Sequence, residues 1–152
     1  MKVSERALTM LRHHEGVRFK PYRDPIGLWT VGVGHLIGDG KTLPDDWNKT
    51  FSLDEVNEIL KRDLRRFERG VERLCPVGLT QPRLDALVSF SFNLGLGTLQ
   101  RSSLRMKHNR EEFDEAANVF LRYNRAGGRI LRGLTNRRRD EREVYLNEEK
   151  TK

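Results

Sequence analysis

The chain has 152 residues, which is enough for one hydrophobic core and too few for two independent domains of ordinary size. It contains 29 Lys and Arg residues against 22 Asp and Glu residues, a formal net charge of +7, which suits a polyanionic partner such as nucleic acid, an anionic lipid surface or an acidic polymer. The single cysteine, Cys75, excludes an intramolecular disulfide, and no segment has the apolar length of a membrane span or a signal peptide. We therefore expect a single domain, residues 1–152, that folds in the cytoplasm without stable membrane insertion.

The N-terminal part of the sequence predicts a helix followed by a small sheet. The helix covers about residues 4–14, with Ser4 as its N-cap and apolar residues at helical spacing. Glu15 then falls at the C-terminal end of this helix, where the helix dipole disfavours an anion. Short extended runs broken by glycine and proline follow, which predicts an antiparallel sheet with tight turns. We expect this sheet lobe to cover about residues 15–51.

The remainder of the sequence predicts helices. Ser52 and Glu55 match a capping box, and apolar residues at helical spacing extend the connecting helix over about residues 52–74. Thr80 begins a nonpolar helix that runs through Phe92, and shorter helices follow around residues 103–108 and 112–123. A turn at residues 126–128 precedes a last helix at about 133–146. The expected fold is α+β, with a small antiparallel sheet lobe joined by a long helix to a helical lobe at about 75–148.

Two carboxylates and a hydroxyl near the start of the chain are candidates for catalysis. Glu15 follows a helix, Asp24 lies nine residues later in or beside the sheet, and Thr30 is on the next predicted strand. Glycosidic hydrolysis needs two carboxyl groups in unlike environments, one to donate a proton and one to activate water. The spacing alone leaves another interpretation open, in which Glu15 pairs with an arginine, Asp24 forms a turn and Thr30 is only a strand residue.

Three separated blocks of the sequence resemble one protein family. The run from Glu15 to His35, EGVRFKPYRDPIGLWTVGVGH, is similar to that of the phage-type lysozymes, or endolysins, which are muramidases of glycoside hydrolase family 24. The segment DALVSFSFNLG at residues 85–95 and the block from Ala126 to Leu146 resemble the same family in the same order. The resemblance covers nearly the whole chain and implies a two-lobed lysozyme-like domain.

The resemblance also implies roles for the three candidate residues. Glu15 corresponds to the general acid, Asp24 to the base or water-orienting carboxylate, and Thr30 to its companion on the water. The family implies inversion at the anomeric carbon, with water attacking from the face opposite Glu15. The two carboxyl groups are then expected to lie about 6.5–9.5 Å apart, which leaves room for that water.

The resemblance also implies further residues that contact the substrate, and most of these have an alternative structural explanation. Phe92 has the helical spacing of a core residue, His35 resembles a structural histidine of the family, and Arg129 follows two glycines as an ordinary surface arginine would. The implied substrate-binding set is Gly34, His35, Phe92, Asn93 and Arg129. Tyr123 stands where many relatives carry Trp. The four histidines are spread along the chain without metal-ligand spacing, so no metal and no cofactor are expected.

The implied activity is hydrolysis of the β-1,4 bond between N-acetylmuramic acid and N-acetylglucosamine in bacterial peptidoglycan, causing host cell lysis. The family implies a monomer that accumulates in the host cytoplasm and reaches the periplasm and cell wall through a holin-dependent membrane lesion. The alternatives are a lytic transglycosylase, a catalytically silent wall-binding domain, and a nucleic-acid-binding module suggested by the run RRRDERE at residues 137–143. Because its arginines have Glu141 and Glu143 within helical reach, we expect a solvated, self-paired face there and no nucleic-acid partner.

Overall fold

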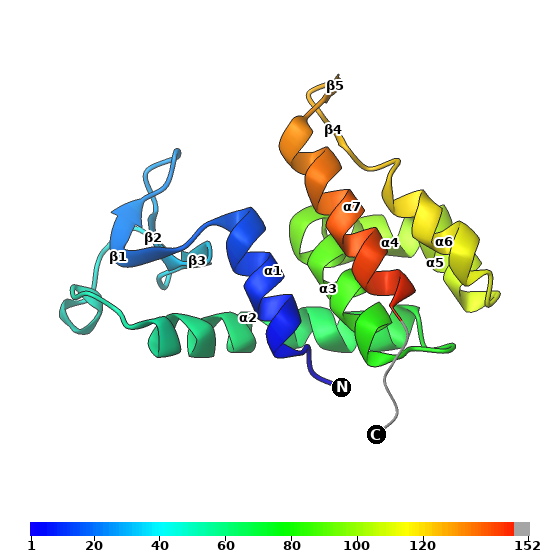
Figure 1. Ribbon diagram of the computed structural model, residues 1–152. Helices are drawn as coiled ribbons and strands as arrows, with labels where there is room; N and C mark the ends of the chain where they lie inside the picture. Colours follow the sequence, from blue (N-terminus) through cyan, green and yellow to red (C-terminus); the bar gives the residue numbers. More distant parts are fainter. Residues whose placement is uncertain (148–152) are drawn as a thin grey trace. The chain divides into compact units, whose positions relative to one another are not determined.

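The computed structural model describes residues 1–147 and divides them between two compact units (Figure 1). Leu8–Leu64 form the sheet lobe, and Met1–Ala7 together with residues 65–147 form the helical lobe. The divisions fall within α1 (Glu5–Glu15) and α2 (Leu53–Leu74), the long helix expected from the sequence. The predicted α+β class, with a small antiparallel sheet and a helical lobe, is confirmed. The expected end of the helical lobe at residue 148 lies outside the described residues.

The sheet lobe contains three short antiparallel strands in sequential order. β1 (Arg18–Arg23) pairs with β2 (Trp29–Gly32), which pairs with β3 (His35–Leu36). Tyr22 lies opposite Thr30, and Val31 lies opposite His35. A short 3-10 helix, η1 (Asp45–Trp47), follows the sheet. Buried apolar side chains of this lobe are Leu8, Met10, Leu11, Val31, Val33, Ile37, Phe51, Val56, Ile59, Leu60 and Leu64.

The start of α2 has the capping box that the sequence predicts. The Glu55 amide donates to Ser52 Oγ at 3.1 Å, and the Ser52 amide donates to Glu55 Oε1 at 3.0 Å. A hydrogen bond from the Lys49 ammonium lowers the pKa of Glu55. These contacts fix the first turn of α2 against the loop that follows η1.

The helical lobe is built around α3 (Gln81–Leu94), whose N-cap is Thr80 as predicted. The other elements are α4 (Leu96–Arg101), α5 (Ser103–Asn109), α6 (Phe113–Phe120), β4 (Arg125–Ala126), β5 (Arg129–Ile130) and α7 (Arg132–Leu146). α3 packs closely against α7, and its middle turns are buried on every side. The all-round burial explains why this segment is nonpolar throughout rather than amphipathic. None of the helices among the described residues has the length and apolar character required to cross a bilayer.

Ser4 does not cap the first helix, contrary to the prediction. Its hydroxyl and its amide both donate to the carboxylate of Asp85, which is fully buried at the start of α3. The cap prediction is wrong because a buried carboxylate distant in sequence needs donors more than an exposed helix end does. Ser4 therefore fastens the N-terminal segment to α3 within the helical lobe.

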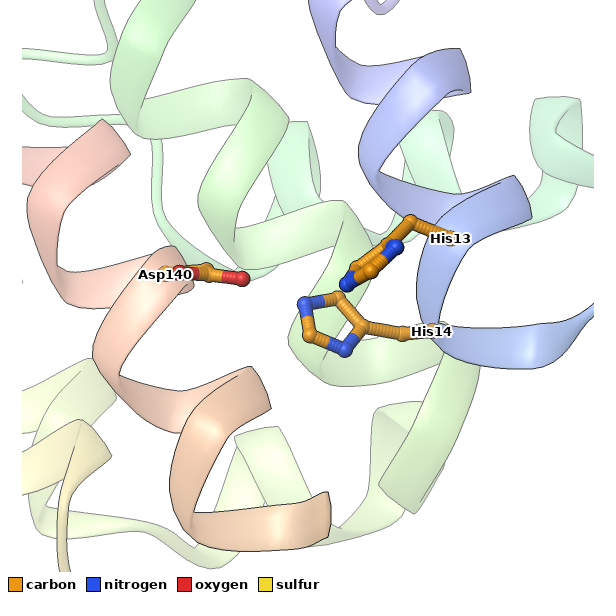
Figure 2. A group of neighbouring side chains, drawn as sticks. All are labelled: His13, His14 and Asp140. Carbon is orange, nitrogen blue, oxygen red and sulfur yellow. The ribbon is translucent and has the colours of Figure 1, made fainter.

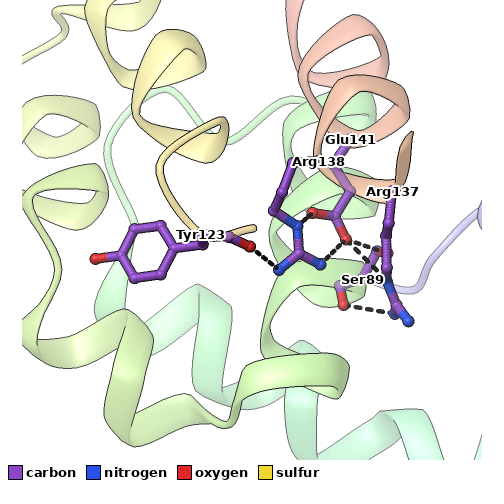
Figure 3. Close-up of polar contacts among 5 residues, drawn as sticks. All are labelled: Ser89, Tyr123, Arg137, Arg138 and Glu141. Carbon is purple, nitrogen blue, oxygen red and sulfur yellow. Dashed lines mark hydrogen bonds and ion pairs between the residues drawn. The ribbon is translucent and has the colours of Figure 1, made fainter. Parts of the chain in front are cut away.

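The prediction that the charged residues at 137–143 form a solvated face is also wrong, because several of them are buried. Two of the predicted ion pairs do form (Figure 3). Arg137 Nε and Arg138 Nε lie 3.2 and 2.7 Å from the Glu141 carboxylate, and Ser89 Oγ donates to it at 2.6 Å. All three charged side chains are almost completely buried. Burial raises the pKa of Glu141, and the two guanidinium groups oppose that rise. The expected pair of Arg139 with Glu143 does not form within residues 1–147.

Candidate functional site

Glu15 is the last residue of α1, as the sequence predicts, and its side chain is exposed. The helix ends there because Gly16 adopts φ +81°, and its amide donates to the Arg12 carbonyl at 2.9 Å. His13 and His14 precede Glu15 on the last turn, with ring centroids 4.8 Å apart (Figure 2). The carboxyl group therefore projects from a fixed helix end in a polar surrounding.

Asp24 lies at the β1–β2 turn, where its carboxylate organises the backbone. Oδ1 accepts hydrogen bonds from the amides of Ile26 at 3.0 Å and Leu28 at 2.8 Å. The Asp24 amide in turn donates to the Leu28 carbonyl at 2.8 Å, which closes the turn. Within residues 1–147, the second carboxylate oxygen accepts no hydrogen bond. One oxygen is thus structural, and the other is available to a ligand.

Thr30 lies on β2, almost completely buried at 5% exposure. Its hydroxyl donates to the Leu28 carbonyl at 3.0 Å, so the hydroxyl proton is directed into the turn. Leu28 consequently connects two candidate residues, because its amide donates to Asp24 and its carbonyl accepts from Thr30. The hydroxyl oxygen retains lone pairs that can accept a hydrogen bond from outside the turn.

His35 begins β3 directly after Gly34, which has φ +67° in the tight β2–β3 turn. Its Nδ1 lies 2.8 Å from Asp63 Oδ2 on α2, and its ring stacks on Trp47 with centroids 5.7 Å apart. The imidazole is therefore held on one edge and one face by its own lobe. These contacts are those of a structural histidine that fastens the sheet to α2 and η1.

A groove of about 470 Å³ lies beside this cluster, entirely within the sheet lobe. Trp47, Phe51 and Ile59 supply its apolar surface. Its charged residues are Asp46, Lys49, Asp54, Glu55, Glu58 and Arg62. An aromatic surface with a charged rim can bind a polar ligand that also has an apolar face.

The other three sequence candidates belong to the helical lobe. Phe92 on α3 is partly exposed, and its ring packs edge-to-face on Phe67 with centroids 5.4 Å apart. The neighbouring Asn93 has a buried Oδ1 that accepts no hydrogen bond from residues 1–147. Arg129 is exposed on β5, after a hairpin turn in which Gly127 and Gly128 both have positive φ. Phe92 therefore has a packing role whatever its role toward a ligand.

Sequence reasoning missed three residues that position the candidates. Leu28 acts through its backbone, and Asp63 and Trp47 hold His35 from positions 28 and 12 residues farther along the chain. No local pattern predicts contacts at those separations. The dipeptide Asp24-Pro25 with Gly27 was the available signal for the turn, and it does indicate the Asx-type geometry that is found.

Comparison with known proteins identifies the family. The sequence profile named phage lysozyme matches residues 12–141. The endolysin of Salmonella phage P22 is 35% identical over 147 residues, covering 96% of this chain and 99% of the relative. The endolysin of Bacillus phage B103 is 35% identical over 148 residues and 96% of this chain, which spans about half (54%) of that relative's length. A crystal structure of a P22 lysozyme mutant has a TM-score of 0.87 at 34% identity, covering 97% of this chain and 99% of the other. This chain belongs to the phage lysozyme family.

Proposed function

We propose that this protein is an endolysin, a glycoside hydrolase that cuts the β-1,4 bond between N-acetylmuramic acid and N-acetylglucosamine in bacterial peptidoglycan. Membership of the phage lysozyme family and the endolysin relatives support this activity. The observation that carries it is that Asp24 and Thr30 both bind the backbone of Leu28, while the second Asp24 carboxylate oxygen accepts no hydrogen bond from residues 1–147 and the Thr30 oxygen can still accept one. Water is the ligand that such a pair suits.

In the proposed reaction, Glu15 donates a proton to the leaving oxygen of the glycosidic bond. Asp24 accepts one proton from the attacking water through its second carboxylate oxygen, while the Thr30 oxygen accepts a hydrogen bond from the O–H that the water keeps. Thr30 acts only as an acceptor here because its own proton is committed to the Leu28 carbonyl. Attack from the face opposite Glu15 inverts the anomeric carbon, which requires carboxyl groups about 6.5–9.5 Å apart.

The proposed substrate contacts extend beyond the three reacting groups. Gly34, Phe92, Asn93 and Arg129 are assigned to glycan binding, and His35 contributes through the strand that it anchors. The groove lined by Trp47 offers an aromatic face on which a sugar ring or a peptide stem can lie. No cofactor enters this reaction, because a proton donor, a carboxylate and water complete the chemistry of hydrolysis.

We further propose a biological setting for the activity. The protein acts as a single lysozyme domain and a monomer, accumulates in the host cytoplasm, and reaches the cell wall when a holin permeabilises the membrane. Its effect there is host cell lysis. Release of enzyme from cells only when a membrane lesion is supplied, with sedimentation of a monomer, tests these parts separately from the chemistry.

The chemical proposal is tested by mass spectrometry of soluble products released from purified peptidoglycan. Wild type is expected to release ordinary reducing muropeptides, and Glu15→Gln to slow the release by about 10²- to 10⁴-fold, the usual contribution of a general acid. Glu115→Gln is the matched control because Glu115 is an exposed residue on α6 with no proposed role. Proton NMR of the first-formed anomer tests inversion.

The same products separate the alternatives. Anhydro-sugar products would identify a lytic transglycosylase and remove the roles proposed for Asp24 and Thr30. Binding to sacculi without any released product, in wild type and variants alike, would identify a silent wall-binding domain. Equal activity of Glu15→Gln and wild type would reject Glu15 as the acid.

A further inference from the structure

The outer face of the second half of α2 is formed by arginines. Arg65, Arg66, Arg69 and Arg73 are all exposed, whereas Phe67 and the following apolar residues of the helix are buried in the helical lobe. At 100° per residue, the four arginines fall within an arc of about 100° on the helix surface. They extend over about 12 Å of the helix axis, at 1.5 Å per residue. We call these four residues the arginine face.

The positive charge of this face is not neutralised by its neighbours. Glu68 is turned inward and accepts a hydrogen bond from the Val3 amide at 2.7 Å, and Glu72 pairs with the N-terminal ammonium at 2.6 Å. Within residues 1–147, none of the four guanidinium groups makes an ion pair. The Arg66 guanidinium lies 4.3 Å from the centroid of the Phe67 ring. The acidic residues of this half of the helix are thus committed to other partners.

The net positive charge of the chain is also concentrated in the lobe that carries the arginine face. Residues 8–64 contain 8 Lys and Arg against 9 Asp and Glu, a net charge of −1. The other residues of the sequence contain 21 Lys and Arg against 13 Asp and Glu, a net charge of +8. The excess positive charge therefore belongs to the helical lobe, whereas Glu15, Asp24 and Thr30 belong to the sheet lobe. Anion binding at the arginine face needs none of the proposed catalytic residues.

We propose that the arginine face docks on the surface of an anionic phospholipid bilayer. Guanidinium groups bind phosphate oxygens in a bidentate manner, and their long side chains on one face of a helix can reach a planar array of headgroups. The face has no exposed apolar side chain to insert into the lipid, so the contact is electrostatic and peripheral. It likewise has no exposed aromatic ring on which the bases of a single-stranded nucleic acid would stack.

The test measures co-sedimentation of the full chain with vesicles at low salt. The vesicles contain phosphatidylglycerol and phosphatidylcholine in equal parts, or phosphatidylcholine alone. The test variant replaces the arginine face by glutamine: Arg65→Gln, Arg66→Gln, Arg69→Gln and Arg73→Gln. The control variant removes the same charge from exposed arginines elsewhere in the helical lobe: Arg101→Gln, Arg110→Gln, Arg122→Gln and Arg139→Gln. Circular dichroism and thermal unfolding establish that both variants are folded.

We expect wild type to bind the anionic vesicles and not the neutral ones. The arginine-face variant is expected to lose about 100-fold or more in partition coefficient, because each arginine near an anionic surface contributes about fivefold. The control variant is expected to lose much less. Equal losses in the two variants would show that only net charge matters and would overturn the proposal, as would equal binding of wild type to neutral vesicles.

Binding to a duplex DNA oligonucleotide is measured at the same phosphate concentration as in the anionic vesicles. Tighter binding to DNA than to anionic vesicles, lost in the arginine-face variant, would overturn the bilayer assignment in favour of nucleic acid.

Release of soluble muropeptides by the same variants separates this proposal from the proposed catalytic function. We expect kcat for that release to be unchanged in both variants, since the substitutions leave the sheet lobe intact.

Discussion

The Asp24 carboxylate holds the β1–β2 turn through one oxygen and is proposed to act as a base through the other. Replacing Asp24 by asparagine separates these two roles. Its Oδ1 accepts two backbone amides, and an asparagine carbonyl can accept the same pair. We expect Asp24→Asn to retain the β1–β2 turn and to lower the rate of peptidoglycan hydrolysis by about 10²- to 10⁴-fold. Asp24→Ala is expected to lose the activity and, in addition, about 1–3 kcal/mol of stability, because the Ile26 and Leu28 amides lose their acceptor. Thermal unfolding and a turbidity assay on cell walls provide the two measurements.

Asp39→Asn is the control for this comparison, because Asp39 is an exposed turn residue of the same lobe whose Oδ1 accepts a backbone amide. It is expected to retain full activity. If Asp24→Asn were as active as wild type, Asp24 would be a turn residue only. If it were as unstable as Asp24→Ala, the loss of activity could not be assigned to chemistry.

Single residues show where sequence reasoning succeeds and where it fails. The positions of Glu15 at a helix end and of Thr30 on a strand follow from local patterns, and both are confirmed. The burial of Arg138 could not be predicted in this way, because the RRRDERE run has the composition of an exposed helix face. The structure buries it because α3 packs against α7 and Ser89 of α3 binds Glu141. Long side chains with charged ends are placed by partners distant in sequence, which periodicity does not reveal.

At the scale of elements, the contact of α5 with α7 makes folding sensitive to pH. His108 on α5 and Tyr145 on α7 are buried, with Nδ1 and the phenol oxygen 2.7 Å apart. Burial lowers the pKa of His108, and the Arg83 guanidinium acts in the same direction. Burial also raises the pKa of Tyr145, so the phenol stays protonated beside the imidazole.

We therefore expect the free energy of unfolding to fall as the pH drops below the ordinary histidine pKa of about 6.5. The unfolded chain takes up the proton there before the folded chain does, so acid favours the unfolded state by at most about 1.4 kcal/mol per pH unit. The contribution is fully present above that pKa and is lost as the pH falls toward the lowered folded value. Urea unfolding of wild type and His108→Gln at pH 7.5 and pH 5.5 measures it, with a smaller pH effect expected in the variant. The exposed His13→Gln serves as control, and a wild-type profile that is flat over this range would contradict the assignment.

The elements themselves were predictable in proportion to their length. α2 and α3 were placed to within about two residues because many apolar residues repeat at helical spacing. α4 and the β4–β5 hairpin were missed, since each is too short for a repeat to appear and both depend on the helices around them. Leu96 of α4, for example, packs where a Cβ on Gly70 of α2 would stand, an approach that only a glycine permits.

At the scale of the whole molecule, composition showed that the chain is basic, and the spacing of apolar residues predicted the α+β class, but neither indicated where the charge lies. The sheet lobe is slightly acidic and carries the three proposed catalytic residues, while the helical lobe carries the excess of arginine. Such a division separates attraction to an anionic polymer from the chemistry performed on it. We therefore expect added salt to change KM and substitutions of the proposed catalytic residues to change kcat.

Raising the ionic strength is expected to raise KM on intact sacculi and to leave kcat nearly unchanged. Added salt shortens the Debye length from about 10 Å at 0.1 M to about 3 Å at 1 M, which weakens attraction between the helical lobe and the carboxylates of the wall. Short soluble peptidoglycan fragments carry few charges, so their hydrolysis is expected to depend much less on salt. Initial rates on both substrates over this range measure the difference, with ionic strength set by sodium chloride. A fall in kcat with KM unchanged would place the electrostatic effect at Glu15 and Asp24 instead, because salt would then be acting on the reacting charges rather than on encounter.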